Sequence, residues 1–280
     1  MTLNGLVGDS GMASPRYYLT LTGAPRERLV ASAEAYRSAM KSREILRCVH
    51  RPTITAGPFC MTTFPGLDNR LLLPPFFSVQ RNSDGIFGLM LQKCVDGSRV
   101  AFLPWILLHA PEPPRTFAPN DLWTDAATVR MADIIIAGVL GHEMPAGHVT
   151  TETRLAVLGE HFRRLGALTL PDFEAHVRKV QQFRNFGFIT ALHGQLQAYG
   201  ESPGFWADDV RRMIDVLSKA STAEDHLVPR DLLHGRDAGA ARQLSQELVG
   251  KFGEVLGAWP GMVAAAKRLR ASGCRLTEAL

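Results

Sequence analysis

The pattern of apolar residues divides this chain into two unequal parts. Up to about residue 114 the pattern changes character roughly every ten to fifteen residues, as it does in small α/β units. Pro111, Pro113 and Pro114 then form a stiff, extended connector, and beyond it the pattern is helical almost throughout. The sequence therefore predicts an α/β domain over residues 1–114, followed by an all-helical domain over residues 115–280.

The first part predicts a small mixed sheet with flanking helices. Residues 17–22 and 44–50 are typical of strands, and residues 26–41 carry apolar side chains at helical spacing. Three glycines between Gly5 and Gly11 favour a turn. The Pro- and Gly-rich residues 53–77 predict a structured loop with at most one short strand. A helix over residues 84–94 and a strand over residues 99–103 complete the predicted fold.

The second part predicts a succession of helices. Apolar residues recur at helical spacing, and glycines follow several of the helix ends. Thr169 and Asp172 have the spacing of a capping box at the start of one helix. The predicted helices cover residues 122–140, 151–165, 171–199, 205–220, 238–256 and 260–272.

Composition favours a cytoplasmic protein without a membrane span. No run of about 18 uncharged apolar residues occurs, since the longest covers only residues 134–140. Met1 is not followed by the basic and apolar regions of a secretory signal. The four cysteines are scattered without a Cys-x-x-Cys pair, as expected for reduced, buried thiols.

The charge of the chain is unevenly distributed. Residues 1–110 hold 12 Lys/Arg and 7 Asp/Glu, an excess of +5, whereas residues 111–280 hold 19 and 20. A mildly basic first part favours an anionic ligand such as a nucleotide diphosphate, although scattered arginines on a solvated face give the same count. No basic run or basic and aromatic stripe occurs, so nucleic acid is not expected as a partner.

Two short segments carry side chains that are suited to chemistry. Asp84 stands where its carboxylate could cap the helix that follows, or could accept a proton from an acceptor hydroxyl while Arg81 keeps it ionised. His109 follows an apolar run and precedes the prolines. It could be a metal ligand or a partly buried side chain bonded to the backbone.

Together these segments resemble the second half of bacterial glycosyltransferases with the A-type fold. The resemblance covers roughly residues 5–115 and is carried by residues 73–88 (LPPFFSVQRNSDGIFG) and 103–111 (LPWILLHAP). In such enzymes an acidic motif before a helix supplies the catalytic base, and a later histidine completes a divalent metal site. The resemblance implies that Asp84 is the base and that His109 binds Mn²⁺ or Mg²⁺. It also implies that the substrate pocket is formed by Arg81, Asn82, Gly85 and Trp105.

The sequence also departs from that family. Ser83 stands where the family usually has glutamate, and no Asp-x-Asp motif of the nucleotide-binding half occurs in the chain. An enzyme of this kind would transfer a sugar from a nucleotide-diphosphate sugar to a hydroxyl or similar acceptor. It would need the nucleotide-binding half from a longer reading frame or from a partner chain. The alternative is a binding or scaffold protein, derived from a glycosyltransferase, that holds a partner chain or a second copy.

Overall fold

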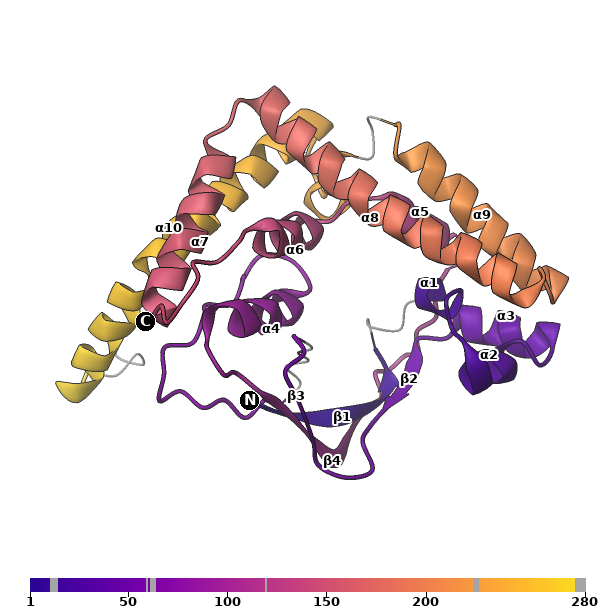
Figure 1. The fold of residues 1–280 in the computed structure, drawn as a ribbon, viewed down its shortest axis with the longest axis horizontal. Coiled ribbons are helices and arrows are strands. Elements are labelled where there is room, and N and C mark those ends of the chain that lie inside the picture. Colours follow the sequence, from indigo (N-terminus) through magenta and orange to yellow (C-terminus); the bar gives the residue numbers. More distant parts are fainter. Residues whose placement is uncertain (11–14, 59, 61–63, 119, 224–226, 275–280) are drawn as a thin grey trace.

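The computed structural model describes residues 1–10, 15–58, 60, 64–118, 120–223 and 227–274. These residues form a mixed α+β fold with a small, curled sheet of four strands (Figure 1). The strands are β1 (Thr2–Asp9), β2 (Glu44–Arg47), β3 (Thr53–Thr55) and β4 (Val100–His109). The helices are α1 (Pro15–Tyr18), α2 (Gly23–Leu29), α3 (Ala33–Lys41), α4 (Ser83–Cys94), α5 (Asp121–Ala127), α6 (Met131–Gly141), α7 (Thr151–Gly166), α8 (Leu170–Tyr199), α9 (Gly204–Ala220) and α10 (Ala238–Ala271), with a 3₁₀ helix η2 (Arg230–Leu232).

The sheet is mixed, as the sequence predicts, and its strand order is β2-β1-β4-β3. β1 and β4 are parallel neighbours, whereas β2 and β3 pair antiparallel at the two edges. The register of the central pair shifts between two contacts, Leu3 with Phe102 and Gly5 with Ile106. This shift places Trp105 in an irregular part of β4.

Two predictions for the first part are wrong. The glycine-containing segment around Gly5 is not a turn but lies within β1. Residues 17–22, expected as a strand, contain the end of the short helix α1 and a turn. The reason for the second difference is tertiary, because Leu19 is fully buried in a cluster with Tyr36 and Trp206. Burial of this leucine overrides the β propensity of its neighbours.

In three places the structure differs from the predicted helices in where a helix begins or ends. Residues 26–41 form two helices, because the chain turns between Leu29 and Ala33. The predicted helix over residues 122–140 is also divided, into α5 and α6. Conversely, α10 continues through Pro260, where the sequence predicts two separate helices.

The other predicted helices are confirmed. Residues 84–94, 151–165, 171–199 and 205–220 all lie in single helices. The Thr169 side chain accepts the Asp172 backbone N–H at 3.3 Å, and its hydroxyl donates to the Asp172 carboxylate at 2.6 Å. Gly200 ends α8 in the left-handed conformation, with a φ of 57°. Local capping therefore sets both ends of this helix.

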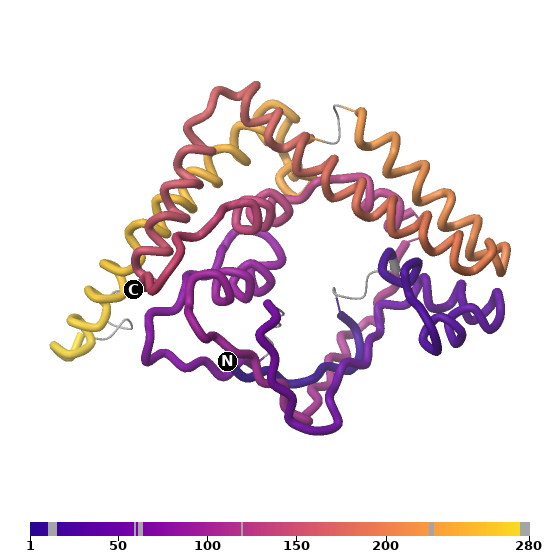
Figure 2. The backbone as a smooth tube through the Cα atoms, viewed as in Figure 1, coloured from indigo at the N-terminus to yellow at the C-terminus, as the bar shows by residue number. Residues whose placement is uncertain are grey.

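In the view of Figure 2 the helices and the sheet are arranged around the outline of the molecule. α7 and α10 form one limb, α8 and α9 form the next, and the sheet closes the opposite side. Among the described residues, no helix is both long enough and apolar enough to cross a membrane.

The predicted domain boundary marks a change in secondary structure but not a break in the core. The largest apolar cluster joins Ile86 and Met90 of α4 to Ile134 of α6, Leu158 of α7 and Phe252 of α10. The C-terminal end of α4 is also tied to the helical part. The Lys93 ammonium group donates to the backbone carbonyls of Leu140, at 3.1 Å, and His142, at 2.5 Å. The α/β part and the helical part thus share one interior.

The limb formed by α7 and α10 depends on glycines. A Cβ placed on Gly253 would lie 2.6 Å from the Gly159 carbonyl oxygen and 2.6 Å from the Arg163 nitrogen. A Cβ on Gly166 would lie 2.5 Å from Gly250 Cα. Such separations show that the two helices contact each other backbone to backbone at these positions.

Candidate active site

The candidate site is built on the adjacent ends of the two parallel strands. β1 ends at Asp9 and β4 ends at His109, and Gly8 pairs directly with His109. Gly8 has a φ of 102°, and a Cβ there would lie 2.3 Å from the His109 carbonyl oxygen. Only glycine fits this approach, so the residue type at position 8 lets the two strand ends lie close together.

Asp9 is the buried charged residue at these strand ends. Its carboxylate accepts hydrogen bonds from Arg43, at 3.1 and 3.2 Å, and from Arg115, at 3.1 and 2.6 Å. The hydrogen bond from Arg43 is the main cause that holds the pKa of Asp9 below its usual value. Arg115 adds to this effect, while burial opposes it. Asp9 therefore stays ionised and serves to fix two arginines rather than to accept a proton.

His109 is held in a defined orientation. Its ring Nδ1 lies 2.5 Å from the Asp9 carbonyl oxygen, which can only accept, so Nδ1 carries the proton. In the neutral ring Nε2 then has a lone pair for another group, and the side chain is exposed. Histidines that bind metals are commonly oriented by such a bond from the other ring nitrogen.

Few other side chains near His109 could act as ligands for a metal ion. The Asp9 carboxylate is shared by Arg43 and Arg115, and both arginines are positive. Among the described residues, no group of three His, Cys, Asp or Glu side chains could hold a metal ion. His109 thus offers one possible ligand position. The assignment of Mn²⁺ or Mg²⁺ stays a prediction.

The start of α4 differs in detail from the prediction. The helix begins at Ser83, so Asp84 lies inside the first turn and does not occupy the capping position. Asn82 holds that position with a φ of 72° and without a side-chain cap bond. The half-buried Asp84 carboxylate accepts the Gly85 N–H at 2.9 Å. A negative charge in the first turn is still stabilised by the helix dipole.

The other predicted pocket residues lie at different places. Arg81 and Asn82 are exposed just before α4, and no ion pair between Arg81 and Asp84 occurs in the described part of the chain. A Cβ on Gly85 would lie 2.3 Å from the Asn82 side-chain oxygen, so the two residues touch. Trp105 is 70% exposed within β4, several residues before His109. Its place in a substrate pocket stays a prediction.

The short connection between α4 and β4 fixes the direction in which the helix crosses the sheet. This connection joins the end of α4 to the start of β4, and Leu91, Val95 and Val100 are buried together there. α4 therefore runs back over the sheet, antiparallel to β4 (Figure 1). Asp84 acts on the Cys60 thiol, which lies beside Met1 at the start of β1, whereas His109 pairs with Gly8 near the end of β1. The printed contacts therefore do not bring Asp84 and His109 together.

Asp84 also influences a neighbouring thiol. Burial, and after it the negative charge of Asp84, raises the pKa of Cys60 to about 12. The Cys60 sulfur lies 3.6 Å from the Met1 sulfur. Cys60 is therefore a protonated, structural thiol that packs beneath the first half of α4.

Sequence reasoning missed the ion-pair group around Asp9. Arg43 and Arg115 are 34 and 106 residues away from Asp9 along the chain, so no local motif links them. The available signal was Gly8-Asp9-Ser10, a polar segment directly after an apolar stretch.

No protein-family model, no curated protein and no solved structure matches the chain.

Proposed function

We propose that this chain is the acceptor-side part of a glycosyltransferase that moves a sugar from a nucleotide-diphosphate sugar to a hydroxyl acceptor. The observation that supports this proposal best is the orientation of His109, whose Nδ1 lies 2.5 Å from the Asp9 carbonyl oxygen, so that Nε2 is left for another group. The resemblance assigns the base to Asp84 and the metal ligand to His109, which come from separate elements. A cytoplasmic location belongs to the same proposal.

In this mechanism Asp84 acts as a general base. Its carboxylate takes the proton of the acceptor hydroxyl as that oxygen attacks the anomeric carbon of the sugar. The bond from the anomeric carbon to the diphosphate breaks, and the nucleoside diphosphate leaves with the electron pair. His109 would offer Nε2 to Mn²⁺ or Mg²⁺, whose chemistry is to neutralise charge on a diphosphate.

The test uses the full chain with a panel of UDP- and GDP-sugars, Mn²⁺ and simple hydroxyl acceptors. Release of nucleoside diphosphate is followed by liquid chromatography. The variant is Asp84→Asn, which keeps the shape but lowers the basicity, and it should slow release at least about 100-fold. Asp215→Asn is the matched control, because Asp215 is 57% exposed in a surface pair with Lys219. The assay is run with the nucleotide-binding half present, from the longer reading frame or the partner chain, because the acceptor-side part alone is not expected to release nucleoside diphosphate. Release that Asp84→Asn leaves unchanged would overturn the proposal.

A second candidate function, protein binding, is favoured by the exposed apolar side chains of the sheet. Leu46 of β2 and Leu108 of β4 are 72% and 74% exposed, and both pair with Val7 between them. Ile54 and Trp105 are each 70% exposed on β3 and β4. Leu46, Val7 and Leu108 are neighbours on three adjacent strands, and two large, exposed apolar side chains there are a candidate contact surface.

The occupant that this second candidate specifies is another copy of the chain. Light scattering across a range of concentrations should then show a dimer. Replacing Leu46 and Leu108 together by serine should return the chain to a monomer with unchanged circular dichroism. The control replaces Leu269, which is 57% exposed near the end of α10. A monomer at every concentration would exclude self-association through this face.

A further inference from the structure

Arg16 is an arginine whose charge has no carboxylate partner among the described residues. It lies in α1 and is half-buried, and its Nε is buried without a hydrogen-bond partner. Its guanidinium group lies over two aromatic rings. The guanidinium carbon is 4.9 Å from the ring centre of Phe188 in α8 and 5.4 Å from that of the adjacent Tyr17. Contacts with ring faces orient a guanidinium group without neutralising it.

The charges nearest to Arg16 leave a positive excess. Arg184 binds Asp133 at 2.6 Å, and Arg130 binds Asp125 at 2.8 Å. Each of these two aspartates therefore already has an arginine, and Arg16 is the third arginine of the group. Both other arginines act on Arg16 as like charges, and Tyr17 and Asp133 oppose them.

The charges of two more residues near this group, Arg230 and Asp231, cancel each other. Arg230 also binds the Asp125 carboxylate, at 2.7 Å. Asp231 accepts the backbone N–H of Met131 at 3.0 Å and adds one negative charge. The group as a whole thus keeps an excess of one positive charge, and Arg16 carries it.

A half-buried arginine beside two like charges is electrostatically costly. A desolvated cation beside like charges is stabilised most effectively by an anion that replaces the lost water. Burial, together with the positive charges of Arg184 and Arg130, lowers the pKa of Arg16. Arginine keeps its proton despite this shift, so the cost is relieved by binding an anion rather than by losing charge.

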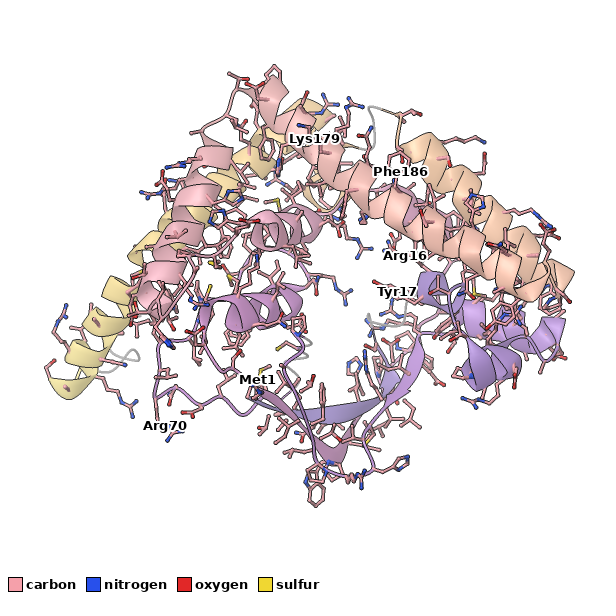
Figure 3. The ribbon with its side chains drawn as sticks, in the orientation of Figure 1. Met1, Arg16, Tyr17, Arg70, Lys179 and Phe186 are labelled. Carbon is pink, nitrogen blue, oxygen red and sulfur yellow. The ribbon has the colours of Figure 1, made fainter. Side chains whose placement is uncertain are left out.

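We propose that Arg16, with Arg184 and Arg130 next to it, binds the phosphate or diphosphate group of a ligand. Figure 3 labels Arg16 and Tyr17 on α1, below α8 and across the view from α4. The guanidinium group can donate two parallel hydrogen bonds to phosphate oxygens. The Tyr17 ring, 58% exposed, offers a face to a sugar or base attached to that phosphate.

This site is made of residues other than Asp84 and His109, so it does not rest on the proposed function. A phosphate group could belong to a nucleotide-diphosphate donor or to a phosphorylated acceptor. Both sources present the same chemistry to Arg16, and the probes of the experiment distinguish them.

The experiment is isothermal titration calorimetry of the full chain with inorganic pyrophosphate, UDP and glucose 1-phosphate. Pyrophosphate should bind, and its affinity should fall as NaCl is raised, because the attraction is between charges. Arg16→Gln should weaken binding at least about tenfold, since a charge-assisted hydrogen bond is lost. Arg28→Gln is the matched control, because Arg28 is an exposed arginine on α2, and it should bind as the unaltered chain does.

A second variant keeps the test decisive if Arg16→Gln alters folding. Phe188→Leu retains the arginine but removes one ring that orients it, and it should weaken binding severalfold with unchanged circular dichroism. Tighter binding of UDP than of pyrophosphate assigns the site to a donor, and tighter binding of glucose 1-phosphate assigns it to an acceptor. No heat with any probe, or equal affinities for Arg16→Gln and Arg28→Gln, would overturn the proposal. Asp84→Asn should leave pyrophosphate binding unchanged, so failure here is distinct from failure of the catalytic proposal.

Discussion

Gly253→Ala is expected to separate the two helices of the α7–α10 limb. The added methyl group would lie 2.6 Å from the Gly159 carbonyl oxygen, 2.6 Å from the Arg163 backbone nitrogen and 2.9 Å from the Arg163 Cγ. The first two atoms belong to the backbone of α7 and cannot rotate away as a side chain can. The substitution therefore requires the helix axes to shift, which disturbs the packing of Phe252 and Leu256 on either side.

The expected cost follows from two opposing effects. Overpacking a tight contact costs about 1–3 kcal/mol. Alanine is also a better helix former than glycine by about 1 kcal/mol, and this gain applies at any interior position of α10. Gly257 provides the matched control, because a Cβ there meets nothing within 4 Å. The helix-propensity gain cancels between the two variants, so Gly253→Ala should be less stable than Gly257→Ala by about 2 kcal/mol.

The assay is urea unfolding followed by circular dichroism, with thermal melting as a second measure. For a chain of this size a difference of about 2 kcal/mol corresponds to a melting difference of roughly 4–8 °C. Gly257→Ala should melt above the unaltered chain and Gly253→Ala below it. If Gly253→Ala were as stable as Gly257→Ala, the backbone contact between α7 and α10 would not exist as described.

Three further predictions concern charged groups. Burial, reinforced by neighbouring positive charges, lowers the pKa of His161 from 6.5 to about 4, so the unfolded chain takes up a proton first as the pH falls. Stability should therefore be full above pH 6.5 and decline by about 2 kcal/mol toward pH 4, and His161→Gln should flatten this decline in urea titrations. Asp9→Asn should cost about 3 kcal/mol in urea unfolding at neutral pH, because two arginines lose their charged partner, whereas Asp215→Asn should cost almost nothing. Arg26→Lys should lower the melting temperature by several degrees. The guanidinium carbon of the buried Arg26 lies 3.7 Å from the ring centre of Tyr199 and 4.3 Å from that of Trp206, and an ammonium group stacks on rings less well. Equal melting temperatures of the two proteins would contradict this reasoning.

The long helices were predictable because their signals are local. α8 begins with the Thr169 capping box and ends at Gly200, and both signals lie within a few residues of the helix end. The break between α5 and α6 has a distant cause instead. Asp231 accepts the Met131 N–H, and the Arg230 N–H bonds the Val129 carbonyl oxygen, so the chain is turned by residues about 100 positions away. The spacing of apolar residues around residue 130 gives no sign of these distant hydrogen bonds.

Pro260 shows the opposite error. A proline in a helix removes one hydrogen bond and crowds the preceding turn, which made two helices the natural prediction. In the structure Trp259, next to the proline, donates its indole N–H to the Leu73 carbonyl oxygen at 2.7 Å. That contact fixes the segment in place, and α10 continues through the proline.

The candidate site was only partly predictable for the same reason. Asp84 and His109 were predicted through resemblance, and they come from the consecutive elements α4 and β4. Asp9, Arg43 and Arg115 come together only once β1, β2 and β4 are paired. Arg16 lacks any sequence signal, since its importance lies in the charges that surround it in three dimensions.

Among the described residues, side-chain hydrogen bonds to the rest of the protein hold α4 at its C-terminal end, whereas its first half is held by the packing of Ile86 and Phe87. Its last residues are bound through Lys93, whose ammonium group donates to the Leu140 carbonyl and whose own carbonyl accepts from Arg154 at 3.1 Å. At the other end Asn82 provides no side-chain cap. Hydrogen exchange should therefore begin at the first turn of α4 and reach the Lys93 end last. The Asp84 carboxylate is then carried on the part of the helix that opens most often, so a ligand that orders this turn would be detected first as slower exchange at residues 83–86.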